Sequence, residues 1–230
     1  MKKLGIIAFI CALILGAFFA NVFSFGKLSF TGFSFSRGIK GSGNVQTEKR
    51  EIANFKNIEV GGVFKVEIIA QKDFDVQIEA DDNLLQYIST EIDGETLEIS
   101  TSKRISTRNP IIVKIGAPDI EHLEVSGASS LVLGNVNNDS LRVDLSGASN
   151  VKVEGATKDL IMELSGASRV NAENLQAENV SIDASGASKA DVFASNRLEA
   201  DLSGACRVNY SGSPKDLVKK TSGASKISEK

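Results

Sequence analysis

The sequence has no tryptophan, one histidine, two cysteines and three prolines in 230 residues. Because proline is so scarce, long disordered stretches are not expected. Cys11 lies in an apolar run at the N-terminus, which leaves Cys206 without a partner for an internal disulfide. His122 is the only histidine, so a zinc site made of cysteine and histidine is not expected, and no metal or cofactor is predicted.

Aromatic residues are also scarce, and positive charge does not prevail. Aromatic side chains account for 6% of the chain, against 42% for all hydrophobic residues, and this balance favours thin β-layers packed through Val, Leu, Ile and Ala. The formal net charge is −3, and no basic stripe with interleaved aromatic residues is present. Nucleic acid is therefore not a predicted partner.

The N-terminus has the features of an export segment. Two lysines precede an apolar run from Leu4 to Ala20. The run is longer than the about 7–15 residues of a cleavable segment and close to the ~20 residues that span a bilayer. Cleavage after Ala20 would put Phe18 where a small residue is needed. We expect residues 1–25 to form a hydrophobic helix that anchors the chain in the membrane, with a cleaved signal peptide as the alternative. Both place the remainder outside the cytoplasm.

Residues 26–46 are predicted to be a linker. Five phenylalanines between residues 23 and 35 either meet the lipid headgroups beside an anchor or form a short β-segment that packs on the domain. Residues 37–46 include three glycines and are expected to be flexible. The folded domain is placed at residues 47–230.

The strongest signal is an internal repeat. Ser-Gly-Ala-Ser begins at residues 126, 146, 165, 185 and 222, and Ser-Gly-Ala-Cys begins at residue 203. The successive copies begin 20, 19, 20, 18 and 19 residues apart. A unit of about 19 residues is too short for a propeller blade and is typical of one coil of a solenoid.

Alternating apolar residues surround the copies. Leu160, Met162 and Leu164 precede one copy, and Val170 and Ala172 follow it. Alternation with a period of two indicates strands with one buried face, and two strands of about five residues joined through Ser-Gly-Ala would make one coil. The predicted fold is all-β: a right-handed, single-chain parallel β-helix (solenoid) with coils of about 19 residues and six regular coils between residues 120 and 228.

The motif predicts the corner of each coil. Glycine adopts a positive φ without steric cost, so the glycine of every copy is assigned to a corner. The following alanine is expected to point inward, and the flanking serines are expected to form hydrogen-bonded ladders. The six corner glycines are Gly127, Gly147, Gly166, Gly186, Gly204 and Gly223.

The region before the repeats is less regular. Residues 58–68 have the apolar spacing of a coil around Gly61 and Gly62, and we interpret them as a degenerate coil. Asp93-Gly94 is a strong signal for a hairpin turn. We expect this region to cap the N-terminal end of the stack. Its further strands are predicted at residues 76–80, 88–92, 97–101 and 111–115.

One outward row is acidic. A carboxylate stands two residues before five motif copies, and Lys220 takes this position in the sixth. The acidic residues are Glu124, Asp144, Glu163, Asp183 and Asp201. A second row directly follows each motif and consists of Ser130, Asn150, Arg169, Lys189, Arg207 and Lys226. We expect the two rows to neutralise each other on a solvated face; the alternative is a cation or polysaccharide groove along the acidic row.

No catalytic residue is predicted. A serine without a nearby base is inert, and His122, although close in sequence to Ser126, is interpreted as a polar surface residue. Cys206 is interpreted as a replacement for the fourth-position serine, with a disulfide-linked dimer as the alternative. Residues 104–109 are expected to form a polar loop. A β-helical lyase or hydrolase that uses the acidic row stays as an alternative function.

Residues 41–45 and 51–68, followed by the serial Ser-Gly-Ala-Ser motifs, resemble the head GIN domain of putative auto-transporter adhesins. The resemblance covers about residues 41–228. It implies a β-solenoid of the bacterial envelope or surface, and it implies no catalytic residues. We therefore expect a non-catalytic extracytoplasmic module that binds an envelope polysaccharide or a surface protein. An anchored accessory of envelope signalling is a further alternative.

Overall fold

The computed structural model describes residues 38–230. The predicted hydrophobic helix at 1–25 and most of the predicted linker lie outside the described residues. Between residues 38 and 230, no helix has the length and apolar character needed to cross a membrane. This part of the chain is all-β, and its one helical element is the 3-10 turn η1 (Leu85–Tyr87).

The strands fall into an N-terminal group of short strands and a C-terminal group that includes the four long ones. The first group contains β1 (Ile39–Lys40), β2 (Val45–Arg50), β3 (Asn57–Gly62), β4 (Lys65–Ile69), β5 (Asp75–Asp81), β6 (Ile88–Asp93), β7 (Thr96–Thr101), β8 (Ile105–Ser106), β9 (Ile112–Gly116) and β10 (His122–Gly127). The second contains β11 (Ser130–Leu145), β12 (Asn150–Leu164), β13 (Arg169–Ala184), β14 (Lys189–Leu202), β15 (Arg207–Ser211), β16 (Asp216–Thr221) and β17 (Lys226–Glu229).

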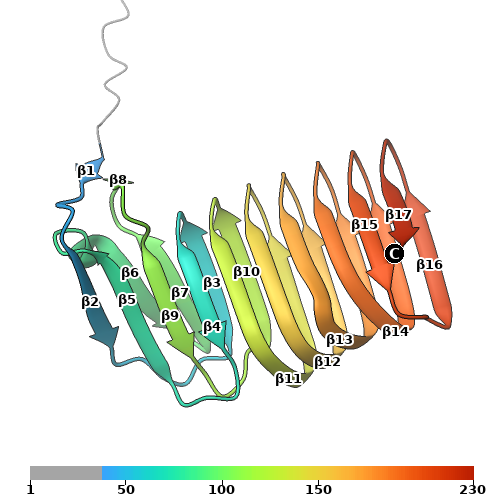
Figure 1. The fold of residues 1–230 in the computed structure, drawn as a ribbon, viewed down its shortest axis with the longest axis horizontal. Coiled ribbons are helices and arrows are strands. Elements are labelled where there is room, and N and C mark those ends of the chain that lie inside the picture. The colour runs from blue at the N-terminus through green and yellow to red at the C-terminus, as the bar shows by residue number, and fades with distance from the viewer. Residues whose placement is uncertain (1–37) are drawn as a thin grey trace, which may run out of the picture. The chain divides into compact units, whose positions relative to one another are not determined.

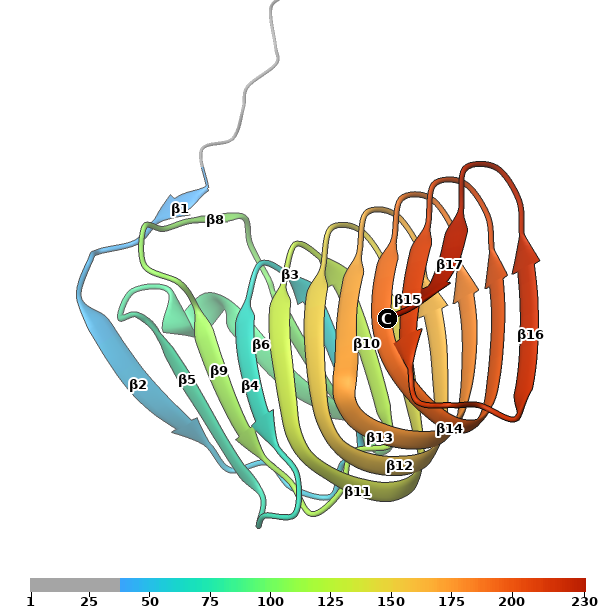
Figure 2. The ribbon, with the colours of Figure 1, turned by 45° about the vertical axis from the view of Figure 1, so that its right-hand side comes forward.

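The long strands form a parallel β-solenoid, as predicted. Strands β10 to β14 pair in parallel with their successors, and each of β11 to β14 runs from one Ser-Gly-Ala corner through a bend to the next corner (Figures 1 and 2). The two short strands expected in each coil are therefore joined across the bend into one strand of 14 to 16 residues. We call the two long edges of the stack the corner edge and the bend edge.

Two faces lie between these edges. The post-corner face consists of strand segments that follow a corner, and it includes β4, β15 and β17. The pre-corner face consists of segments that lead into a corner, and it includes β3, β10 and β16. Because the chain reverses at every corner, residues on the two sides of a motif lie on different faces.

The corner glycines adopt the positive φ predicted for them, between 71° and 86°. The amide of the alanine after each one donates a hydrogen bond of 2.7–2.8 Å to the carbonyl of the glycine one corner earlier, and Gly62 is the acceptor for the first motif. The degenerate coil around Gly62 is thus confirmed. Six motif corners enclose five complete turns, which corrects the expected six regular coils.

The orientation predicted for the alanines is wrong. The motif alanines are exposed, whereas the fourth residue of the motif is buried in Ser129, Ser149, Ser168, Ser188 and Cys206. A buried hydroxyl needs a partner, and the turn supplies one. The hydroxyl of Ser149 donates to the carbonyl of Ser146 at 3.1 Å, and that of Ser168 donates to the carbonyl of Ser165 at 3.1 Å.

Differences in coil length are absorbed at the bend edge. Strands β11 and β13 have 16 residues and follow the 20-residue spacings, whereas β14 has 14 residues and follows the 18-residue spacing. The pairing register shifts between Leu133 and Val136, between Lys152 and Gly155, and between Ala172 and Ala177. These bulges leave the two faces and the corners in register.

Aliphatic columns fill the interior. Leu141, Leu160, Val180 and Leu198 stack on one another and are at most 2% exposed. A second inward column, which includes Ala200, becomes polar in the last described coil, whereas Leu217 follows Leu198 in the first. Lys219 there follows the inward-facing Ala200 in register and lies over the ring of Tyr210, with its Nζ 4.6 Å from the ring centroid. Its Nζ also donates to the Tyr210 hydroxyl at 3.1 Å.

The N-terminal end has the predicted hairpins. Strands β6 and β7 pair antiparallel around Asp93-Gly94, and β2, β5 and β9 continue the post-corner face with antiparallel pairs. The four further strands predicted for this region correspond to β5, β6, β7 and β9. Within residues 38–230, β2 and β6 are the edge strands at this end of the stack.

Two stretches predicted to be irregular contain strands. Residues 39–40 and 45–46, placed in the linker, lie in β1 and β2, and β1 pairs with β8 inside the expected loop 104–109. Asp81 joins the two stretches, because it pairs with Val45 of β2 and its carboxylate accepts hydrogen bonds from Thr107 and Asn109 at 2.7 and 2.6 Å. These two bonds, Asn109 first, lower the pKa of Asp81. Gly41 passes so close that a Cβ there would lie 1.7 Å from the carboxylate.

Candidate functional site

The predicted acidic row is one column on the pre-corner face. Glu124, Asp144, Glu163, Asp183 and Asp201 are register partners on successive strands, and Lys220 follows them. The column also continues through Glu59, Glu98 and Glu91 on β3, β7 and β6. Sequence reasoning missed these three. Glu59 could have been found from the sequence, because it stands two residues before the Gly61-Gly62 corner, as the other carboxylates stand before their motifs.

The basic row does not neutralise the acidic column, which corrects the prediction. The corner between the two rows puts the basic row on the post-corner face, and no ion pair joins the two rows in residues 38–230. The acidic column instead receives cations from its own face. Arg142 donates from Nε to Asp144 at 2.8 Å and from a terminal nitrogen to Glu163 at 2.5 Å.

Part of the acidic column forms no ion pair within residues 38–230, and this part includes Glu59, whose pKa is shifted. Burial, and after it the carboxylates of Glu124 and Glu98, raise the pKa of Glu59 above its ordinary value of 4.5. The neighbours act because equivalent side chains on paired strands are in contact range and like charges repel.

Replacing Glu59 by Gln is therefore expected to stabilise the protein at pH 7. The folded chain holds the Glu59 proton more tightly than the unfolded chain, so stability falls as the pH rises from 4.5 through the raised pKa. After allowance for solvent screening, Glu59→Gln should gain on the order of 0.5 kcal/mol at pH 7 and nothing at pH 4. Urea denaturation at both pH values measures this. Glu67→Gln, which breaks the 2.9 Å pair with Lys65 on the other face, should show no gain.

A hollow of about 310 Å³ follows the centre of the column. Its polar lining combines carboxylates with the first serine of three motifs; these are Glu124, Asp144, Glu163, Asp183, Ser146, Ser165 and Ser185. The carboxylates are arranged in line rather than around a point. Among the described residues, no three His, Cys, Asp or Glu side chains converge as metal ligands.

His122 and Ser126 do not form a catalytic pair. The Nε2 of His122 lies 2.9 Å from the Oδ2 of Asp144, whereas the Ser126 hydroxyl donates to the carbonyl of Val60 at 3.4 Å. Cys206 is buried, and its thiol lies 3.2 Å from the carbonyl of Ser203, as the serines do in the other corners. These contacts support the interpretation of Cys206 as a serine replacement.

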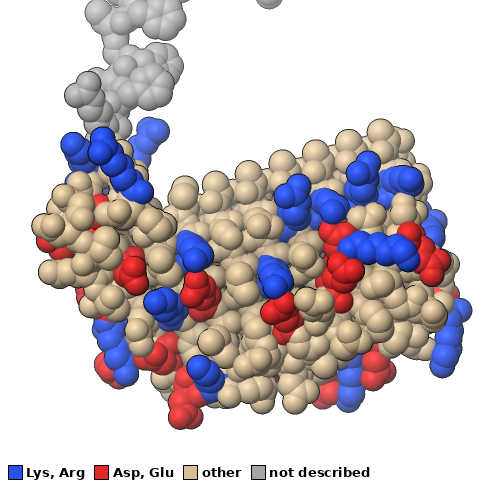
Figure 3. All heavy atoms as spheres, in the orientation of Figure 1, with Lys and Arg blue, Asp and Glu red and all other residues tan. Residues whose placement is uncertain are grey.

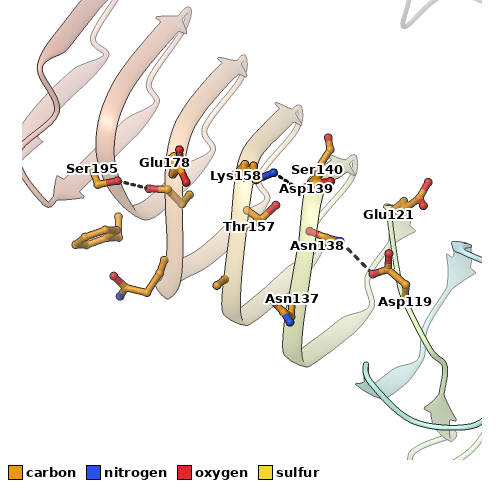
Figure 4. A pocket seen from close by; sticks show the side chains of 14 residues that line it. Asp119, Glu121, Asn137, Asn138, Asp139, Ser140, Thr157, Lys158, Glu178 and Ser195 are labelled. Atoms are coloured by element: carbon orange, nitrogen blue, oxygen red, sulfur yellow. Dashed lines mark hydrogen bonds and ion pairs between the residues drawn. The ribbon is translucent and has the colours of Figure 1, made fainter.

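A larger groove lies at the bend edge, where no site residue was predicted. It encloses about 880 Å³ (Figure 4). Its lining includes amide, hydroxyl and charged side chains from β11 to β14 and from the segment before β10, together with one aromatic ring. These are Asp119, Glu121, Asn137, Asn138, Asp139, Ser140, Thr157, Lys158, Gln176, Glu178, Phe193 and Ser195. The bulged segments of β11, β12 and β13 form its floor.

Hydrogen bonds fix part of this groove. The amide of Asn138 donates to the Ile120 carbonyl at 2.8 Å. It also donates to the Asp119 carboxylate at 3.2 Å (Figure 4). The Oδ1 of Asn138 is buried and has no hydrogen-bond partner among residues 38–230. Lys158 contacts Asp139 at 2.5 Å, which raises the pKa of the lysine. With four carboxylates and one lysine, the groove is acidic.

Known proteins share this architecture. A putative adhesin from Bacteroides fragilis superposes with a TM-score of 0.70 at 22% identity, over 84% of this chain and 100% of that chain. A putative lipid binding protein from Parabacteroides distasonis reaches a TM-score of 0.55 at 20% identity, over 83% and 98%. A putative adhesin from Parabacteroides merdae reaches 0.53 at 19% identity, over 83% and 98%. At these identities the likeness establishes the fold alone, and no curated protein matches.

A family model gives the sequence relationship. The model described as "Putative auto-transporter adhesin, head GIN domain" matches residues 54–214. The match extends from the degenerate coil through β15 and so includes the acidic column on β3 to β14 and the bend groove. Because it spans more than half of the sequence, the chain belongs to the head GIN domain family of putative auto-transporter adhesins.

Proposed function

We propose that this protein is a non-catalytic adhesion module, located outside the cytoplasm, that binds a neutral surface glycan in the bend groove. The groove carries the proposal because it is the surface where the coils depart from their repeat. Coil length and pairing register vary there, while both faces and the corner edge keep a constant register. A solenoid can diversify such loops and bends without disturbing its core.

The chemistry of the groove suits a sugar. Amide and hydroxyl groups can donate hydrogen bonds to sugar hydroxyls and accept them, and carboxylates can accept them. The partly exposed ring of Phe193 offers an apolar surface. Four carboxylates against one lysine disfavour an acidic ligand by simple repulsion. The same polar lining is unfavourable for an acyl chain, because polar groups would lose their hydrogen bonds to water.

The family and the N-terminal sequence support the location. The adhesin description of the family fits an extracytoplasmic protein. The lysines and apolar run that begin the sequence are typical of an exported or anchored chain. We propose that this segment is retained as an anchor. Intact-mass measurement of the native protein should give the mass of the full chain; a mass that lacks about the first 20 residues would support cleavage instead.

The absence of catalysis is supported by the arrangement of the carboxylates. A glycoside-cleaving site needs two acids in different environments, one of them protonated near neutral pH. The carboxylates of the acidic column stand in line on successive strands of one face rather than on opposite sides of a cleft, and His122 contacts Asp144 rather than a serine.

A glycan array tests the binding site. The labelled full chain should bind neutral glycans, and titration calorimetry with the best of them should give a measurable Kd. Phe193→Ala and Asn137→Ala should each weaken binding at least about tenfold, because both remove groove contacts. Asn150→Ala serves as the control, because Asn150 is exposed on the post-corner face. An array without bound glycans, or equal weakening by all three variants, would contradict the proposal.

A further inference from the structure

Four cations form a strip on the post-corner face. Arg169, Lys189, Arg207 and Lys226 are the first strand residues after four consecutive corners, and they are register partners on β13, β14, β15 and β17. We call them the basic strip. Figure 3 shows lysine and arginine gathered beside the corner edge on this face, with acidic residues lying farther from that edge.

Most of the basic strip lacks a counter-charge from the protein. Lys189 contacts Asp191 at 2.8 Å, whereas Arg169, Arg207 and Lys226 have no ion pair within residues 38–230. Asp191 is already shared, because it also accepts from Asn209 at 2.8 Å and contacts Lys230 at 3.2 Å.

Three other cations on this face differ from the strip. Lys65, Lys114 and Lys152 are each paired with a glutamate, at 2.9, 3.7 and 2.6 Å. The protein as a whole has a net charge of −3, so the strip is not the result of a generally basic composition. Like charges on adjacent paired strands repel, and the strip concentrates four of them in one line.

The surroundings of the strip fit a polymer better than a protein or a membrane. Protein interfaces have an apolar centre, and peripheral membrane proteins insert apolar side chains. None of the exposed large hydrophobic residues in the described part of the chain lies on β13, β14, β15 or β17. What the strip offers is a row of cations at the spacing of the coils, about 4.8 Å, with two guanidinium groups that bind carboxylate, sulfate or phosphate through paired hydrogen bonds.

We propose that the basic strip binds a linear anionic polysaccharide, with its acidic groups lying along successive coils. This site is separate from the bend groove and does not depend on it. The groove is lined with carboxylates and repels the same polymer, so the protein would contact neutral and acidic glycans through different edges. Several weak contacts along one polymer add to a higher overall affinity.

The experiment uses the full chain with three immobilised polymers. Heparin carries sulfate, polygalacturonate carries carboxylate, and dextran is neutral. We expect binding to at least one of the two anionic polymers and none to dextran, with affinity that falls between 50 and 200 mM salt because the contacts are exposed. The polymer preferred identifies the acidic group.

Matched triple variants locate the site. Arg169→Gln, Arg207→Gln and Lys226→Gln together should weaken polyanion binding by at least about tenfold. Lys65→Gln, Lys114→Gln and Lys152→Gln together remove the same charge from the same face and should have little effect, because those cations are already paired. Equal urea midpoints of the strip triple and the parent verify its fold. If the strip triple does not fold, the single variant Arg207→Gln tests the proposal instead. We expect it to bind the polyanion at least about threefold more weakly than the parent.

Other outcomes would overturn the proposal. Equal losses in the two triples would show a general effect of charge. If the parent bound vesicles with anionic lipid more tightly than neutral vesicles, and the strip triple lost this difference without any loss of polymer binding, the strip would be a membrane contact. Self-association that disappears in the strip variant, without polymer binding, would make it a contact between copies. Phe193→Ala should leave polyanion binding unchanged, so failure here and failure of the groove proposal give different results.

Discussion

Gly166→Ala is expected to destabilise the protein by about 3–5 kcal/mol. Gly166 has a φ of +75°, which costs a residue with a Cβ about 1–2 kcal/mol. A Cβ at Gly166 would also lie 2.5 Å from the carbonyl oxygen of Gly147, which accepts the hydrogen bond from Ala167. Because the atom in the way belongs to the backbone of the preceding coil, the clash cannot be relieved by turning a side chain. Urea denaturation followed by circular dichroism measures the loss.

Gly134→Ala is the matched control. Gly134 lies in β11, and no atom lies within 4 Å of a Cβ placed there. Alanine is favoured over glycine by roughly 0.5–1 kcal/mol inside a strand, so this variant should be as stable as the parent or slightly more stable. If Gly166→Ala unfolded at the same urea concentration as Gly134→Ala, the corner contact would not be a source of stability.

Leu160→Ala is expected to cost about 2–5 kcal/mol. Leu160 is 1% exposed and lies between Leu141 and Val180 in a column of the interior. Truncation leaves a cavity between two neighbouring coils, and each coil contacts only the coils before and after it, so the stack has few other contacts with which to close that space. The midpoint and slope of urea denaturation measure the change.

Ile161→Ala tests whether the effect arises from burial. Ile161 follows Leu160 directly, but its side chain points outward and is 37% exposed. The loss should stay below about 1 kcal/mol, because truncation of an outward side chain leaves no enclosed cavity between coils. Similar losses for the two variants would contradict the assignment of inward and outward positions.

The corners and the buried columns could be predicted because each depends on local chemistry. A positive φ requires glycine, and alternation along a strand separates inward from outward residues. The alternation does not extend through a turn. Within the motif, side-chain direction depends on the turn conformation, which is why Ala148 is exposed and Ser149 is buried.

The arrangement of charge required knowledge of the chain reversal. Asp183 and Lys189 are six residues apart and were expected to neutralise each other, but the corner between them puts them on different faces. The bend groove was missed for another reason. Its residues, such as Asn137 and Phe193, lie midway between motifs, where coil length varies and no shared spacing aligns one copy with the next.

The column of hydrogen bonds between successive corners has a mechanical consequence. Each of these bonds, like the strand pairs beside it, joins one coil only to its neighbour. Pulling on the two ends of the described chain therefore loads the outermost coil first and peels coils away one after another. A coil of 18 to 20 residues lengthens by about 60 Å when it is drawn out. Under a pulling force, a surface adhesin built in this way would extend in steps of roughly this length, one coil at a time.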